Sequence, residues 1–180
     1  ALAIDPARPL QRLALPGLMG PTESTRWSDP ERNLLLFDGI ATYTVATDGT
    51  VQIERQITTY QENAAGIADD SYLDINVPET LERLRFEQIS TFAQKYPRHK
   101  LAADEDREFY DPSLPIMTPK VARTELLNLY RITFMGERGW VRDYPGYAES
   151  LSANIDPDDP DRLNIVDSPM LIGQYRVHAQ

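Results

Sequence analysis

Hydrophobic residues recur at helical spacing through the middle of the chain and alternate with polar residues toward both ends. In the middle, apolar positions three to five residues apart predict a long helix from about Asn76 to about Tyr96, which Pro97 ends. A second long helix is predicted to start after the cap Thr118 and to end at Gly136. The predicted apolar faces comprise Leu81, Leu84, Ile89, Phe92 and Tyr96 in the first helix, and Val121, Ala122, Leu126, Leu129, Tyr130 and Phe134 in the second.

A shorter helix is predicted before the first strands. Ser28 and Glu31 have the spacing of a capping box, and Pro30 suits the first turn of a helix. Gly39 can adopt the left-handed conformation that ends such a helix.

Residues 40–59 alternate as a β-hairpin, with Asp48 and Gly49 at the bend. A two-residue turn would place polar residues opposite apolar ones. A three-residue loop with Gly49 in the left-handed conformation keeps each face uniform, so we expect this register. The predicted pairs are Val45 with Val51 and Tyr43 with Ile53.

Further strands are predicted near residues 10–15 and at residues 151–155, 163–166 and 174–179. The fold class is therefore α+β, with antiparallel strands from both ends of the chain packed with two long central helices. Residues 1–26 are rich in proline and are predicted to be an extended segment, which either belongs to this domain or ends a preceding one. Residues 27–180 are predicted to form one domain that is truncated at its last strand.

Composition excludes several kinds of function. The 180 residues include no cysteine, which rules out disulfides, thiolate nucleophiles and zinc–thiolate sites. The net charge of −10 opposes binding to nucleic acid. No apolar run approaches the roughly 20 residues that span a bilayer, so no membrane insertion is expected.

Few residues offer catalytic chemistry. His99 is interpreted as an exposed basic residue after a helix end rather than as a general base, and His178 as a strand residue rather than a ligand. The acidic stretch at residues 156–162 lacks the central glycine and distal glutamate of a calcium loop, so a solvated turn is expected. We predict no catalytic residue, no metal site and no cofactor. The alternative is a small acid/base hydrolase or a ligand-binding domain that uses loop carboxylates, which requires two carboxylates facing one cleft.

The stretch "ITTYQENAAGIADDSYLDIN" at residues 57–76 is strongly polar and has the composition of an active-site lining. It contains no base with a plausible nucleophile beside it. We therefore interpret it as the connection between the hairpin and the first long helix.

Seven segments, in one order along nearly the whole chain, resemble the C-terminal part of contractile tail sheath proteins of the Mu-like phage family. They are "DPARPLQ", "FDGIATYTV", "VQIERQITTYQENAAG", "SYLDIN", "KYPRHKLA", "TPKVARTELL" and "DPDRLNI". Sheath proteins of this family extend further on the N-terminal side, and their last strand usually continues past the position of Gln180. We therefore expect this sequence to be a fragment.

The resemblance implies mechanical work without catalysis. Sheath subunits of phage, prophage or tailocin particles polymerise as a helix around a tail tube, and they contract on a signal from the baseplate to drive the tube through the host envelope. The implied partners are other sheath subunits, the tail tube, the baseplate and the tail terminator. The implied location is the virion tail, assembled in the cytoplasm of the bacterial host.

The resemblance also implies that terminal arms tie neighbouring subunits together by adding strands to each other's sheets. We expect the end of this chain to be such an arm, unless it pairs within its own sheet, for example with residues 163–166. The candidate inter-subunit residues are Tyr175, Arg176, Val177, His178 and Ala179.

Overall fold

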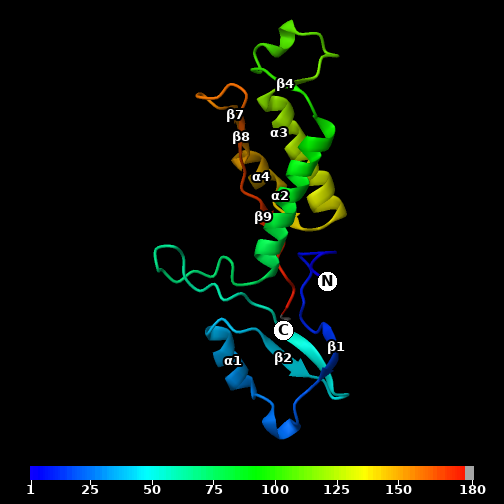
Figure 1. The fold of residues 1–180 in the computed structure, drawn as a ribbon, viewed down its shortest axis with the longest axis vertical. Helices are drawn as coiled ribbons and strands as arrows, with labels where there is room; N and C mark the ends of the chain where they lie inside the picture. The colour runs from blue at the N-terminus through cyan, green and yellow to red at the C-terminus, as the bar shows by residue number, and fades with distance from the viewer. Residues whose placement is uncertain (177–180) are drawn as a thin grey trace. The chain divides into compact units, whose positions relative to one another are not determined.

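The structure is a computed structural model that describes residues 1–176 of the chain. It contains two compact units, one formed by residues 1–81 with the residues from Gly173 onward and the other by residues 82–172 (Figure 1). The boundary between the units falls within helix α2 (Asn76–Lys95). Each unit combines helices with small β-sheets, which confirms the α+β class.

A three-stranded antiparallel sheet forms the centre of the first unit. Its strands are β1 (Ala14–Met19), β2 (Thr42–Val45) and β3 (Thr50–Arg55), in the order β1-β3-β2. The hairpin has the predicted register, with Tyr43 opposite Ile53 and Val45 opposite Val51. Gly49 has a φ of +86°, so the left-handed residue at the bend is also confirmed.

Helix α1 (Asp29–Phe37) contacts β2 and follows the 3₁₀ turn η1 (Glu23–Thr25). The backbone N–H of Ser28 donates to a carboxylate oxygen of Glu31 at 2.7 Å, as the capping-box spacing predicted. Gly39 follows the helix with a φ of +74° and is buried, which confirms its predicted role.

The first residues of the chain are held to the start of α2. The side-chain amide of Asn76 is buried and donates to the carbonyl oxygens of Pro6 at 2.6 Å and Arg8 at 2.9 Å. The strand predicted near residues 10–15 begins later, at Ala14, and its pairing with β3 shifts register between Ala14 and Met19. The possibility that residues 1–26 end a preceding domain stays a prediction.

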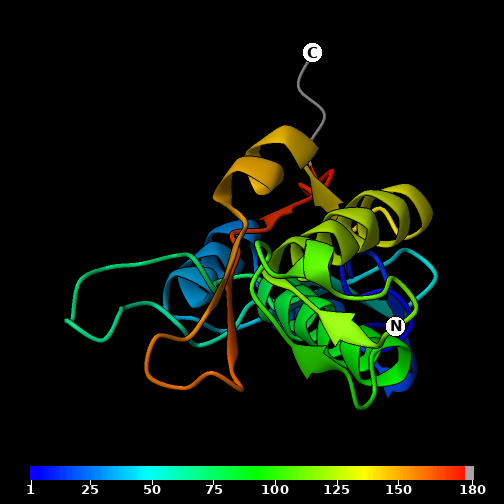
Figure 2. The same ribbon diagram turned by 90° about the horizontal axis from the view of Figure 1, so that it is seen from above.

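Residues 57–76 form a long two-limbed excursion that we call the ribbon. Bridges between Ile57 and Asp74 and between Glu62 and Ala68 pair its outgoing and returning limbs. The ribbon reaches away from the three-stranded sheet of its unit (Figures 1 and 2). It connects β3 to α2 as predicted, but as a paired structure rather than a simple crossover.

The second unit is built on helices α2 and α3 (Pro119–Asn128), which lie side by side (Figures 1 and 2). Lys95 and Tyr96, at the end of α2, both bond to the carboxylate of Glu125 on α3, at 2.5 and 2.8 Å. The predicted second helix continues past α3 as a π-helical segment, η3 (Leu129–Glu137). It therefore ends one residue beyond Gly136, and Gly139, with a φ of +62°, adopts the left-handed conformation instead.

Three two-stranded sheets and a short helix complete the second unit. The strands β4 (Lys100–Leu101) and β5 (Ile116–Met117) form a parallel pair. Two pairs are antiparallel: β6 (Val141–Arg142) with β9 (Met170–Leu171), and β7 (Ser152–Ile155) with β8 (Leu163–Val166). The short helix is α4 (Tyr144–Ser150), and a 3₁₀ turn, η2 (Arg107–Phe109), lies between β4 and β5. The pairs β4-β5 and β6-β9 were not predicted, because two-residue strands leave no detectable alternation in a sequence. The buried side chains of this unit include Leu84, Ala122, Leu126, Tyr130, Phe134, Trp140, Val141, Tyr147 and Leu151.

The strand predicted at residues 174–179 is wrong for its first half. Residues 174–176 have no regular secondary structure, and Val177, His178 and Ala179 lie outside the described residues.

Candidate interaction surfaces

The described part of the C-terminal arm is anchored at one carboxylate. Nη1 of Arg176 donates to Oδ1 of Asp74 at 2.8 Å, and Nε of Arg55 lies 3.5 Å from the same oxygen. The Arg55 Nε is buried and has no hydrogen-bond partner in the part of the chain that the structure describes, so its contact with Asp74 is an ion pair only. Asp74 lies where the ribbon returns beside Ile57, so the arm is held against the base of the ribbon.

The structure places two of the five candidate arm residues. Arg176 is bound to Asp74, whereas the side chain of Tyr175 is largely exposed, with a relative accessibility of 74%. The other three candidates lie outside the described residues, so their role in assembly stays a prediction. The sequence reasoning missed Asp74, because no local pattern can indicate its contact with Arg176, 102 positions away. It also missed Arg55, which lies beside the same carboxylate.

Strand β2 is one edge of the three-stranded sheet. Ala46 donates its N–H to the carbonyl of Thr50 at 2.9 Å, so its backbone groups face β3. In an antiparallel ladder every second residue faces the same neighbour, so the backbone groups of Thr44 also face β3. The backbone N–H and C=O groups of Tyr43 and Val45 consequently point toward the opposite side. Such an edge can accept a further strand.

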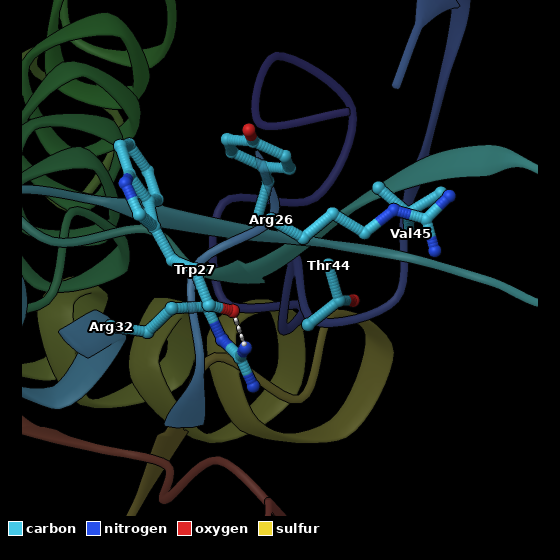
Figure 3. A pocket seen from close by; sticks show the side chains of 6 residues that line it. Arg26, Trp27, Arg32, Thr44 and Val45 are labelled. Atoms are coloured by element: carbon cyan, nitrogen blue, oxygen red, sulfur yellow. Dashed lines mark hydrogen bonds between the residues drawn. The ribbon is translucent and has the colours of Figure 1, made fainter. Parts of the chain in front are cut away.

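A hollow of about 180 Å³ lies beside this edge (Figure 3). Its lining residues are Arg26, Trp27, Arg32, Tyr43, Thr44 and Val45. The rings of Trp27 and Tyr43 form an aromatic wall, with centroids 5.6 Å apart and planes tilted by 52°. Aromatic walls with adjacent cations are typical of surfaces that bind peptides, because they combine apolar area with polar contacts.

The cations of the hollow differ in how much of their charge is neutralised. Arg32 donates to Glu54 at 2.8 Å, to Asp29 at 2.5 Å and to the carbonyl of Trp27 at 2.7 Å. These carboxylates, Glu54 first, raise the pKa of Arg32 above its ordinary value. Within residues 1–176 the guanidinium of Arg26 bonds only to the carbonyl of Pro21, at 3.2 Å, and therefore supplies most of the positive charge that the hollow can offer to a ligand.

Several polar side chains of the ribbon bond to the ribbon itself. The Asn63 carboxamide oxygen accepts the N–H groups of Ala65 and Ile67 at 2.9 and 3.1 Å. The hydroxyl of Thr58 donates to the carbonyl of Tyr72 at 2.7 Å, across the two limbs. Their polarity therefore stabilises the local backbone structure of this connection between β3 and α2.

Tyr60 and Asp69 clamp the two limbs of the ribbon together. The Tyr60 hydroxyl donates to Oδ2 of Asp69 at 2.5 Å, and Ser71 donates to Oδ1 from its N–H at 2.9 Å and from its hydroxyl at 2.6 Å. The bond to Asp69 raises the pKa of Tyr60 to about 12. The bonds from Ser71, followed by that from Tyr60, lower the pKa of Asp69, which is therefore ionised at neutral pH.

A groove of about 510 Å³ runs between the ribbon and the end of α1, and we call it the ribbon groove. Leu36, Phe37 and Leu73 supply apolar surface, and Glu62, Asp69 and Asp70 supply acidic groups at its border. The sequence reasoning treated these acids as loop residues and missed the groove, since the groove exists only once the ribbon folds back on itself.

The second unit contains a buried tyrosine cluster that is structural in character. Tyr147 stacks on Tyr130 with ring centroids 3.7 Å apart, and its hydroxyl donates to Asp167 at 3.0 Å. Gln88 donates to the same carboxylate oxygen at 2.8 Å. Burial, followed by the nearby Asp167, raises the pKa of Tyr147, so its phenol stays neutral and acts as a hydrogen-bond donor.

The remaining candidates for chemistry lie apart from one another. Nδ1 of His99 is 3.3 Å from the carbonyl oxygen of Pro97, and its ring packs edge-on against Tyr96. Asp156 accepts bonds from the Asp158 N–H and the Asn164 amide, as expected of a solvated acidic turn. Among residues 1–176, no three histidine or acidic side chains are grouped so that they could hold a metal ion. That same part of the chain contains no helix long and apolar enough to cross a membrane.

Comparison with known proteins shows that the chain is similar to tail sheath proteins. A family model described as the phage tail sheath protein central domain matches residues 1–59. The chain is 42% identical over 179 residues to the Mu-like prophage FluMu tail sheath protein of Haemophilus influenzae, covering 99% of this chain and 36% of that protein. The crystal structure of a sheath tail protein from Desulfitobacterium hafniense shares the fold, with a TM-score of 0.56 and 13% identity over 93% of this chain and 38% of that one.

The chain thus spans about a third of the length of the curated relative that it matches. The similarity nevertheless runs from one end of this chain to the other, as the seven sequence segments indicated. The chain is homologous to part of a Mu-like phage tail sheath protein.

Proposed function

We propose that this chain is part of a structural subunit of a contractile tail sheath, which polymerises around a tail tube and contracts to drive the tube through the host envelope. The observation that supports this most strongly is the 42% identity to a tail sheath protein along 179 residues. Identity at this level over the whole chain extends to surfaces as well as to the core, and the surfaces of a sheath protein are where subunits meet.

The free strand edge and the anchored arm support assembly by exchange of strands. In this proposal the C-terminal arm, which Arg176 anchors to Asp74, pairs with an edge such as β2 in a neighbouring copy. The contact is heterologous, because arm and edge are different surfaces of one chain, and repetition of such a contact builds a helical filament. In this proposal Tyr175, Arg176, Val177, His178 and Ala179 form the inter-subunit segment.

Contraction follows from the same construction. Strand exchange keeps neighbours connected while rigid subunits rotate from one packing to another. The energy is stored at assembly, so the cycle requires no nucleotide, no metal and no catalytic residue in the sheath. The further partners are the tail tube, the baseplate and the tail terminator, and the site of action is the virion tail after assembly in the bacterial cytoplasm.

Electron microscopy of the gene's full-length product, expressed alone, tests this function. We expect tubular or sheath-like polymers at high protein concentration. Persistent monomers under a range of salt and protein concentrations would contradict the proposal.

A further inference from the structure

Opposite charges are segregated along this chain. Residues 56–82 contain six acids and no cation, whereas residues 88–103 contain three cations and no acid. The acidic run contains the whole ribbon and the start of α2, and the basic run contains the end of α2 and the turn that follows it. Because the chain has a net charge of −10, copies repel one another unless regions of opposite sign meet.

The ribbon groove concentrates the acidic run around an apolar surface. Phe37 contributes an exposed ring, with a relative accessibility of 74%, and Leu73, on the returning limb, lines the same groove. Glu62 and Asp70 are exposed and have no ion pair or side-chain hydrogen bond within the described residues. An open groove with an apolar floor and unpaired acids at its border suits a partner that offers cations on long aliphatic stems.

The groove is rigid before any partner arrives. Gln61 donates to the carbonyl oxygen of Phe37 at 2.9 Å, which ties the outgoing limb to the end of α1. The hydroxyls of Tyr60 and Ser71 donate hydrogen bonds to the carboxylate of Asp69 and hold it in place. Pre-organisation of this kind reduces the entropy that binding would otherwise lose.

The basic run presents two cations on one exposed turn, which we call the basic turn (residues 97–100). Arg98 has a φ of +63°, and both Arg98 and Lys100 are exposed. Within residues 1–176 no carboxylate lies close enough to pair with either, whereas Lys95 is already paired with Glu125 at 2.5 Å. Among the cations of this run that the structure describes, Arg98 and Lys100 of the basic turn are therefore the ones available to pair with a second copy.

We propose that the ribbon groove of one copy binds the basic turn of a second copy. Arg98 and Lys100 pair with Glu62 and Asp70, and the aliphatic stems and Pro97 cover Phe37. This contact rests on the proposed polymer and adds to it a second heterologous link, formed by side chains rather than by exchanged strands.

Cysteine cross-linking tests the contact directly, because the natural chain has no cysteine. The full-length protein is prepared as Ala68→Cys, which labels the groove, and separately as His99→Cys, which labels the basic turn. Mild oxidation of the mixed, assembled proteins should produce a cross-linked dimer that contains one copy of each. Mixing Ala68→Cys with Ser24→Cys, an exposed position on η1, is the matched control.

The inference is overturned if the protein polymerises but the groove–turn pair cross-links no more than the control pair. A dimer formed by Ala68→Cys copies alone also overturns it, since the groove would then face another groove. Failure of the unlabelled protein to polymerise counts instead against the proposed function, so the two failures are distinguishable.

Charge reversal provides a second, independent test of the contact. Glu62→Lys/Asp70→Lys and Arg98→Glu/Lys100→Glu should each reduce polymer yield by at least about tenfold, because like charges then face each other. A mixture of the two variants should recover polymer, since each reversed groove meets a reversed turn. Folded variants that polymerise normally, or a mixture that does not recover, contradict the inference.

Discussion

Arg176 and Asp74 are 102 residues apart in sequence and are joined by a hydrogen-bonded ion pair of 2.8 Å. The arginine belongs to the C-terminal arm, and the aspartate lies where the ribbon returns beside Ile57. The pair therefore holds Arg176 at the base of the ribbon, and Arg55 adds a second positive charge at 3.5 Å from the same carboxylate.

Asp74→Asn should release the arm. The amide keeps the size of the side chain but removes the charge that holds Arg176 and Arg55, and it leaves the buried Arg55 Nε without its ion pair. We expect faster proteolysis and faster amide exchange at residues 173–176, together with a lower yield of polymer. Glu149→Gln, an exposed position on α4, is the control and should change neither. Unchanged exchange in the arm of Asp74→Asn would show that the ion pair does not hold it.

Tyr175→Asp combined with Val177→Asp should block polymerisation without unfolding the core. Two charges in the arm oppose its insertion beside a neighbouring sheet. The measurement is electron microscopy together with thermal unfolding of the full-length protein. Asn33→Asp with Gln94→Asp adds the same charge at exposed helical positions and should leave the polymers intact. Polymers formed by the arm variant would mean that the arm does not couple the subunits.

Asp69→Asn should change the alkaline titration of one tyrosine. Tyr60 has its pKa raised to about 12 by its bond to Asp69, from an ordinary value of 10.0. Since the folded-state pKa is the higher one, the contribution of this bond to stability is complete below about pH 10 and is lost as the pH rises through about 12. Phenolate absorbance should show one tyrosine moving toward its ordinary pKa.

Tyr60→Phe is the companion variant and should remove that titration step altogether. Tyr96, whose pKa is raised to about 12 by burial and by Glu125, should be unaffected in both variants. A titration of Asp69→Asn that matches the unmodified protein would show that the clamp between the limbs is absent in solution.

Phe134→Ala should strongly destabilise the second unit. Phe134 is 1% exposed, beneath Trp140, and its removal leaves a cavity that costs about 3–5 kcal/mol of unfolding free energy. Phe109→Ala is the matched control, because that ring is 78% exposed and its loss should cost less than about 0.5 kcal/mol. Denaturant unfolding measures both, and similar losses for the two variants would contradict the described core.

Gly49→Ala should weaken the hairpin through backbone strain alone. Gly49 has a φ of +86° and an added Cβ meets nothing within 4 Å, so the expected cost of about 1–2 kcal/mol comes from the left-handed conformation. Gly173→Ala is the control, since its added Cβ also meets nothing but its φ is not positive. Equal stability of the two variants in thermal unfolding would argue against the three-residue loop.

Local features of the fold were predictable from the sequence, because they depend on residues close together in the chain. The capping box of Ser28 and Glu31, the extent of α2 up to Pro97, and the hairpin register imposed by Gly49 all follow from spacing and backbone preference. The family resemblance was likewise visible in seven short segments, since a conserved order of local sequence needs no tertiary information.

The candidate surfaces were decided only by the tertiary structure. Asp74 meets Arg176 across 102 residues, and the acids near Asp69 line a groove because Phe37, from a different element, lies beside the ribbon. No periodicity encodes such contacts, since they arise when long loops close and bring distant residues together. The sequence by itself determined the long helices, the hairpin and the resemblance to tail sheath proteins, whereas packing decided which charged groups are neutralised and which remain available to a partner.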